Sequence, residues 1–132
     1  MKKNLLIAVM LCLAFTSCKK DDFRDDYVGT YFGKESWVND GVSYSRDLTV
    51  DVTKSSVSDQ KMILKAKFYT DATEVVDVEV GKDGTFSTSF ATRIGSITET
   101  IFVSGGKFSG NSLKYSYSAQ NFVTCTADVT KR

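Results

Sequence analysis

The side chains that could do chemistry in this chain of 132 residues are few, because it contains no histidine and only three cysteines. Without histidine, neither a serine–histidine–aspartate triad nor a cysteine–histidine pair can form, and zinc lacks its usual ligands. Asp77 and Glu79 come nearest to a catalytic carboxylate pair. They lie on the polar face of a predicted strand, whereas general acid–base catalysis needs a desolvated carboxyl group. No phosphate-binding or calcium-binding motif is present, so the sequence predicts a protein that is not an enzyme and holds no metal or cofactor.

Arg46 is the one charge that interrupts a row of alternating apolar residues, in the segment 42–53. A charge in such a row is usually partnered, so we expect Arg46 to pair with an acid such as Glu35 or Glu99, or to reach an acidic group of a ligand. One tyrosine shares its row, and two more share a face of a later strand, where they could stack on a ligand or fill the core. The candidate site for a ligand or a core ion pair comprises Arg46, Tyr44, Tyr115 and Tyr117.

The first 17 residues have the layout of a secretory signal peptide, with Lys2 and Lys3 before an apolar run over residues 5–15. A helix that spans a bilayer needs about 20 apolar residues, so this run is too short to be one. Cys18 follows immediately. Thr16-Ser17-Cys18 resembles the bacterial lipobox, although Phe15 stands where that family usually has an aliphatic residue. The resemblance implies that Cys18 carries lipid, and two or more acyl chains hold a protein stably on a membrane. The alternative is an ordinary signal peptide that leaves a free thiol.

Lys20-Asp21-Asp22 resembles the lysine–acid–acid export signal of Bacteroidetes-type surface lipoproteins. The resemblance implies a lipid-anchored protein of the bacterial outer membrane that is displayed on the cell surface. Retention on the periplasmic face is the alternative, in which case the three charges are only a solvated tether. The expected organisation is a signal peptide at 1–17, an acylated cysteine and charged tether at 18–26, and a β-barrel domain at 27–132.

The mature chain is nearly neutral. Lys2 and Lys3 leave with the signal peptide, so 17 − 2 = 15 basic residues remain against 16 acidic ones. This balance provides no electrostatic footprint for nucleic acid and no polybasic membrane patch, so membrane contact should come from the lipid alone. Cys125 is left without a disulfide partner. Since no histidine can lower its pKa, we expect it to fill the core rather than act as a nucleophile.

From residue 27 onward the apolar residues recur with a period of two, which is typical of antiparallel strands. Asn39-Asp40-Gly41 predicts a tight hairpin, and Gly105-Gly106 predicts a bulge. If the third and fourth strands pair with matched inward faces, Lys67 lies opposite Asp77 and Lys65 opposite Glu79. Eight strands are expected, near residues 30–38, 42–53, 61–69, 74–80, 85–91, 97–108, 113–117 and 123–129. Such a meander favours an up-and-down barrel, with a two-sheet β-sandwich as the alternative.

The mature chain also resembles the small lipocalin-like domains of Bacteroidetes-type lipoproteins. Its resemblance lies in Val28-Gly29-Thr30-Tyr31, in the segment 105–111 and in Cys125-Thr126-Ala127, although lipocalins proper have tryptophan where Tyr31 stands. The resemblance implies a barrel and allows an apolar ligand, and it carries over no catalytic residue. We therefore expect a non-catalytic binding module for a small apolar or amphipathic ligand. The alternative is a structural module whose outer face or loops meet a protein or glycan partner. A hollow interior would favour the ligand, and a filled one would oppose it.

Overall fold

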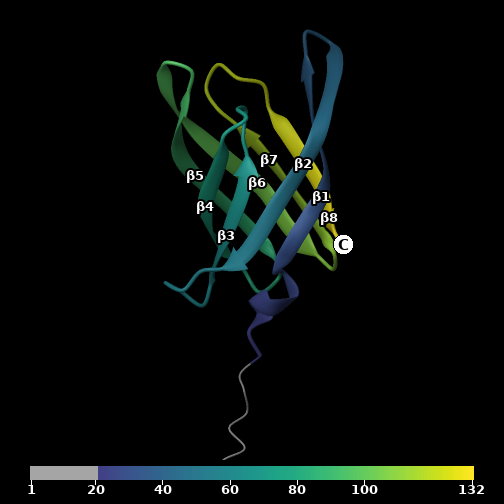
Figure 1. The fold of residues 1–132 in the computed structure, drawn as a ribbon, viewed down its shortest axis with the longest axis vertical. Coiled ribbons are helices and arrows are strands. Elements are labelled where there is room, and N and C mark those ends of the chain that lie inside the picture. The colour runs from purple at the N-terminus through teal and green to yellow at the C-terminus, as the bar shows by residue number, and fades with distance from the viewer. Residues whose placement is uncertain (1–20) are drawn as a thin grey trace, which may run out of the picture.

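The computed structural model describes residues 21–132 and shows a closed barrel of eight antiparallel strands (Figure 1). Each strand pairs with the next one along the chain, and the last pairs with the first. This confirms the predicted lipocalin-like, up-and-down barrel and excludes the sandwich. The predictions for residues 1–17, Cys18 and Lys20 lie outside the described residues. The elements are η1 (Phe23–Asp26), β1 (Gly29–Asn39), β2 (Val42–Lys54), β3 (Lys61–Lys67), β4 (Thr73–Val80), β5 (Thr85–Ile94), β6 (Ile97–Ser109), β7 (Ser112–Ser118) and β8 (Cys125–Lys131).

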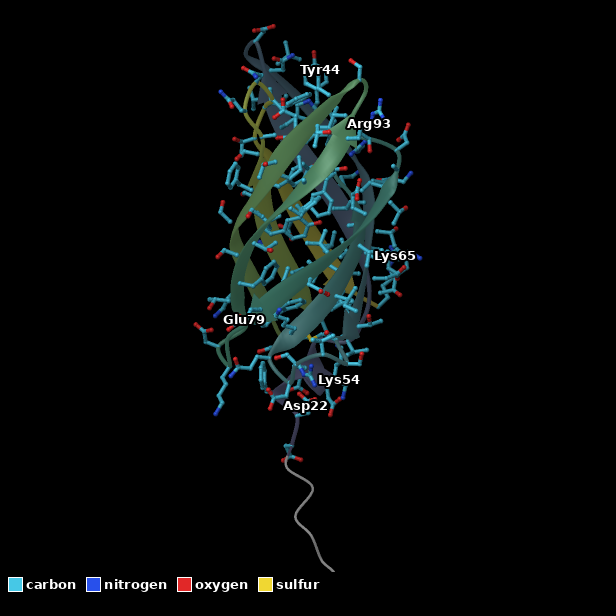
Figure 2. All side chains as sticks on the ribbon, turned by 90° about the vertical axis from the view of Figure 1, so that its left-hand side faces the viewer. Asp22, Tyr44, Lys54, Lys65, Glu79 and Arg93 are labelled. Atoms are coloured by element: carbon cyan, nitrogen blue, oxygen red, sulfur yellow. The ribbon has the colours of Figure 1, made fainter. Side chains whose placement is uncertain are left out.

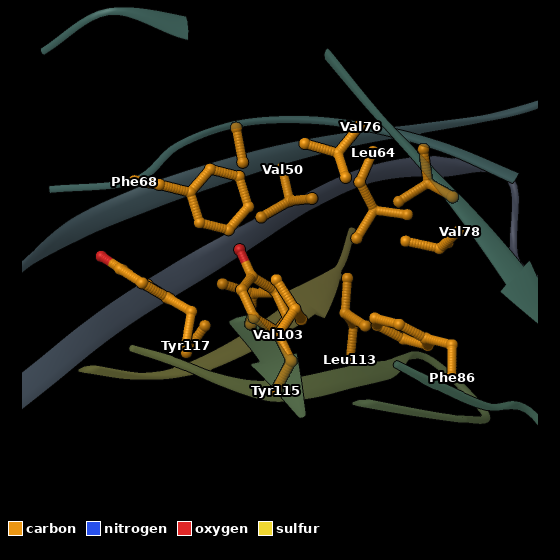
Figure 3. Close-up of a cluster of buried hydrophobic side chains, with 14 of the residues drawn as sticks. Val50, Leu64, Phe68, Val76, Val78, Phe86, Val103, Leu113, Tyr115 and Tyr117 are labelled. Carbon is orange, nitrogen blue, oxygen red and sulfur yellow. The ribbon is translucent and has the colours of Figure 1, made fainter. Parts of the chain in front are cut away.

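The inward rows of the strands fill the barrel with large side chains (Figure 3). Phe68, Tyr115 and Tyr117 pack ring against ring, with the Phe68 centroid 6.0 Å from that of Tyr115 and 5.0 Å from that of Tyr117. The largest fully buried side chains are Tyr31, Tyr115, Tyr117, Phe68, Phe108 and Met62. The interior is therefore filled, so a ligand enclosed in the middle of the barrel is not supported.

Two predicted backbone features are confirmed. Asp40 and Gly41 both have positive φ, 50° and 79°, so β1 and β2 are joined by a two-residue turn of type I′. The bulge lies at Gly105, where φ is 61° and the pairing of β6 with β7 shifts between Ser104 and Lys107.

The predicted pairing of β3 with β4 is wrong. Lys67 lies opposite Thr73 rather than Asp77, and Glu79 lies opposite Lys61 rather than Lys65. The shift keeps the same residues on the inward face, because moving a strand by an even number of residues does not exchange its faces. The inward–outward pattern therefore could not distinguish the two registers.

The reason for this register is a tight turn between the two strands. The predicted pairing centres the hairpin on residue 72, whereas the observed pairing centres it on residue 70, with the turn within 68–72. The backbone N–H of Thr70 donates to the carbonyl oxygen of Phe68 at 2.6 Å, and Tyr69 adopts a positive φ of 57°.

The predicted burial of Val42 and Tyr44 is also wrong, since these side chains are 52% and 44% exposed. They occupy the inward row of β2, but this part of the β1–β2 hairpin rises beyond the body of the barrel (Figure 1). β2 pairs with β3 only over residues 51–54, and its earlier residues have no strand on that side among residues 21–132. Ile97, at the start of β6, is 48% exposed for a similar reason, because it lies next to a hairpin turn.

The last part of the predicted tether packs against the barrel. Asp22 caps η1 by accepting a hydrogen bond from the backbone N–H of Arg24 at 3.1 Å. The buried guanidinium of Arg24 donates to the carbonyl oxygens of Ser58 at 2.6 Å and Lys61 at 2.9 Å. Residues 22–26 are therefore part of the folded domain, which corrects the boundary predicted at residue 27. Phe23–Asp26 forms a single turn of 3-10 helix.

The two ends of the barrel differ. η1 covers one end of the barrel, where Asp22 and Lys54 lie (Figure 2). Tyr44 and Arg93 lie at the opposite end, which we call the open end (Figure 2). Within residues 21–132, no helix has the length and apolar character needed to cross a membrane.

Candidate functional site: a pocket at the open end

Barrel closure brings one carboxylate, one guanidinium and several aromatic side chains together at the open end. Glu35 on β1 lies directly opposite Arg46 on β2, and the next inward pair along the hairpin is Trp37 with Tyr44. On the other side of β1, Trp37 lies opposite Cys125 of β8. Cys125 in turn lies opposite Tyr117 of β7. Four strands thus supply one inward-facing cluster.

Glu35 is the centre of this cluster. Its side chain is 1% exposed, and one carboxylate oxygen accepts a hydrogen bond from Nε of Arg46. The other oxygen accepts a hydrogen bond from the hydroxyl of Tyr117. Two donors, one of them charged, compensate for the loss of water around a buried carboxylate. Arg46 therefore pairs with the first of the two acids named from the sequence.

Arg46 still has hydrogen-bonding capacity to spare. Its side chain is 31% exposed, and Nη1 lies 4.0 Å from a carboxylate oxygen of Asp71, which is itself 96% exposed. Burial disfavours the charged guanidinium, but the hydrogen bond and the charge of Glu35 outweigh it and raise the pKa of Arg46. The guanidinium is thus a permanent cation at the edge of the pocket, with donors available to an anionic or carbonyl group.

The pocket above this ion pair has a volume of about 190 Å³. Trp37 stacks on Tyr44, with ring centroids 5.7 Å apart and an interplanar angle of 12°. Tyr69 meets Tyr117 edge to face at 4.9 Å, and its hydroxyl donates to the carbonyl oxygen of Val123. Aromatic rings thus form its walls and a charged pair its floor. The residues that line it are Glu35, Trp37, Arg46, Tyr69, Tyr117, Val123 and Cys125.

The four residues named from the sequence divide into three positions. Arg46 and Tyr117 line the pocket and meet at Glu35, and Tyr44 forms its rim by stacking on Trp37. Tyr115 lies deeper, in the core (Figure 3). Its buried hydroxyl has no hydrogen-bond partner within the described part of the chain.

The two core tyrosines remain neutral phenols. Burial raises the pKa of Tyr115, and the charge of Glu35 raises it further. Burial also raises the pKa of Tyr117, as does the hydrogen bond that its hydroxyl donates to Glu35. Both hydroxyls therefore stay protonated at ordinary pH. That of Tyr117 donates to Glu35, whereas that of Tyr115 has no partner within the described part of the chain.

Sequence reasoning missed most of the pocket wall. Trp37, Tyr69 and Val123 were not candidates, and Cys125 was expected only as a core filler. Cys125 is 3% exposed, and burial raises the pKa of its thiol. Its side chain therefore serves as part of the pocket wall and is a poor nucleophile. The sequence did contain a signal for Trp37. A two-residue turn in Asn39-Asp40-Gly41 sets the register of the hairpin and so places Trp37 opposite the candidate Tyr44.

Acidic residues do not gather elsewhere into a site. Between residues 21 and 132, no three acidic or cysteine side chains converge as metal ligands would. Of the residues with the predicted export role, Asp21 is exposed and Asp22 caps η1.

No protein-family model matches this sequence, and neither a curated protein nor a solved structure is significantly similar to it.

Proposed function

We propose that this protein is a non-catalytic binding module of the bacterial cell envelope that takes a small amphipathic ligand in the pocket over Glu35 and Arg46. The observation that carries the proposal is the spare hydrogen-bonding capacity of a permanent cation inside an aromatic-walled pocket. An apolar pocket with few, convergent polar groups is the usual form of a small-molecule site.

The ligand class follows from the walls of the pocket. Arg46 suits a carboxylate or another anionic head group, because its guanidinium presents planar pairs of donors. Trp37, Tyr69 and Tyr117 suit an aromatic or short aliphatic body. The volume of about 190 Å³ is below the roughly 300–1,000 Å³ of sites for larger ligands. The ligand is therefore small, or only one end of it enters the pocket.

A lipid anchor at Cys18 would suit this arrangement. Asp22, near the start of the described chain, lies at one end of the barrel, and Tyr44, at the rim of the pocket, lies at the other (Figure 2). A lipidated Cys18 would thus point the pocket away from the membrane. With Lys20, Asp21 and Asp22 as an export signal, that direction is toward the outside of the cell.

The alternative function, a module that presents its outer face or loops to a protein or glycan, is favoured by exposed apolar side chains. Val38, Val42 and Ile97 lie beside hairpin turns and are 59%, 52% and 48% exposed. Single exposed apolar residues are common on proteins, so we place this function second.

Trp37 allows a direct test, because it is the only tryptophan and it lines the pocket. We expect its fluorescence to change saturably on titration with benzoate or hexanoate, and not with benzyl alcohol or hexanol. Arg46→Gln should weaken acid binding about tenfold or more, as loss of a charged hydrogen bond does. Arg93→Gln is the matched control, because Arg93 also projects at the open end but lies outside the pocket.

If no probe changes the fluorescence saturably up to about 10 mM, the proposal is refuted, since a ligand with a Kd above that concentration binds too weakly for a specific site. Mass spectrometry of small molecules that co-purify with the acylated protein would identify the natural ligand. Protease treatment of intact cells would determine on which side of the outer membrane the domain lies.

A further inference from the structure

The barrel leaves strand edges open at two places: between β4 and β5, which pair only at residues 79–80 and 86–87, and along β2. β2 pairs with β1 from Val42 to Val52, but with β3 only over residues 51–54. Residues 42–50 consequently have no strand beside them on the side away from β1, within the part of the chain that the structure describes. The hairpin that carries this edge rises past the tip of the β3–β4 hairpin (Figure 1). Closed barrels normally remove such edges, so this one needs a reason.

The geometry of the turn identifies the backbone groups at this edge. A two-residue turn makes Asn39 and Val42 a hydrogen-bonded pair, so alternate residues of β2 from Val42 onward bond to β1. The residues between them direct N–H and C=O the other way. These are Ser43, Ser45, Asp47 and Thr49, which have no paired strand residue on that side among residues 21–132.

A groove of about 450 Å³ runs beside this edge, between β2 and the β3–β4 hairpin. Its lining is mostly charged or polar, and the two apolar residues in it, Leu48 and Ala66, are buried at its base. Beyond the groove, Val42 and Tyr44 continue the inward row of β2 and stay about half exposed. The open backbone is therefore accompanied by apolar surface on the inward side.

We infer that residues 42–50 bind an extended segment of another protein, which adds a strand to the barrel. Unpaired backbone donors and acceptors in a row match only another extended backbone, and such strand addition is a recurring mode of peptide recognition. The backbone pairing lies on the far side of β2 from β1 and is independent of the proposed function, but an acidic residue of the guest would face Arg46, which also lines the pocket.

The side chains of β2 specify the guest sequence. Its inward positions meet Tyr44, Arg46 and Leu48 in turn, so apolar, acidic and apolar residues suit them. Its outward positions lie beside Ser43, Ser45, Asp47 and Thr49, so polar residues suit them. The guest that fits is an extended segment with apolar–polar alternation and one inward acidic residue.

A second copy of this chain does not fit. Two copies that pair antiparallel along the whole edge place Val42 opposite Val50, and Arg46 is then opposite Arg46. Like charges directly across two strands are destabilising. An inward charge is also a common protection of edge strands against unselective pairing.

The test uses the full mature protein and a short capped peptide. The peptide has threonine at every second position, and valine, glutamate and valine, in that order, between the threonines. On addition of the peptide, we expect the amide protons of Ser43, Ser45, Asp47 and Thr49 to become protected from hydrogen exchange. The amides of Tyr44, Arg46 and Leu48, which bond to β1, should be protected with or without it. This period of two in the change of protection is specific to strand addition.

Ser45→Pro removes one edge donor without touching the β1 ladder, and we expect it to weaken peptide binding about tenfold. Ser45→Ala, which keeps the N–H, should bind as the native protein does. The exchange measurement on the native protein needs no variant, so it decides the question even if Ser45→Pro folds poorly. Lack of new protection at these four amides at about 1 mM peptide would overturn the inference. So would a dimer of the protein alone that Ser45→Pro abolishes.

Discussion

Arg46→Met tests whether the buried acid depends on its partner. Removing the guanidinium leaves the carboxylate of Glu35, which is 1% exposed, with one side-chain hydrogen bond among residues 21–132, from the hydroxyl of Tyr117. Loss of one partner from a buried ion pair costs about 3–5 kcal/mol. Arg46 is 31% exposed, which reduces the strength of the pair, so we expect the lower end, about 3 kcal/mol. This is a large part of the roughly 5–15 kcal/mol that stabilises a domain.

A combined variant separates a stranded charge from lost packing. In Glu35→Leu/Arg46→Met/Tyr117→Phe, all three polar groups are replaced by apolar groups of similar size. Such replacements are often neutral or stabilising. We therefore expect the free energy of unfolding of this variant to lie within about 1 kcal/mol of that of the native protein. Arg93→Met is the control, and its expected effect is below about 0.5 kcal/mol because Arg93 is exposed.

The assay is equilibrium unfolding in guanidinium chloride, followed by circular dichroism with the slope of the transition compared between variants. Two results would contradict the reasoning. One is a loss below about 1 kcal/mol for Arg46→Met alone. The other is a triple variant that is no more stable than the single one, since the cost would then come from packing.

Three further predictions concern other parts of the barrel. Hydrogen bonds from the side chain of Arg24 hold the pKa of Asp22 well below its usual value, so the stability that Asp22 contributes is present above about pH 4 and is lost as the pH falls. Asp22→Asn should therefore flatten the acid-side decrease of the melting temperature. Gly33→Ala should destabilise the protein by about 1–3 kcal/mol in denaturant titration, because a Cβ there would lie 2.2 Å from the carbonyl oxygen of Asp128. Little or no loss would contradict the pairing of β1 with β8. Cys125 is buried and its thiol pKa is raised by that burial, so iodoacetamide should modify it only after unfolding, as peptide mass spectrometry can show.

The alternation of residues was enough to predict the barrel. Met62, Leu64 and Ala66 were assigned inward by their period of two alone, and all three are buried. The Asn39-Asp40-Gly41 turn was predictable because few sequences accept two consecutive positive φ angles. These are local features, which sequence patterns determine well.

Features that depend on distant parts of the chain were not predictable to the same degree. Alternation shows which way Tyr44 points, but not where the barrel wall ends, so its exposure was missed. Arg46 was conspicuous as a charge in an apolar row, and its partner could be narrowed to two acids. The hydrogen bond from Tyr117 to Glu35 joins residues 82 positions apart, so it follows only from closure of β8 on β1.

The cap at the N-terminal end has a kinetic consequence. Because η1 covers that end and large side chains fill the middle, a small molecule bound over Glu35 must depart through the mouth by which it arrived. A strand laid along residues 42–50 would stand beside that mouth, next to Tyr44 on its rim. Its inward acidic residue would face Arg46, so the strand and an anionic small molecule would compete for the same guanidinium. Binding of the strand and binding of the small molecule would therefore be coupled at this one opening of the pocket.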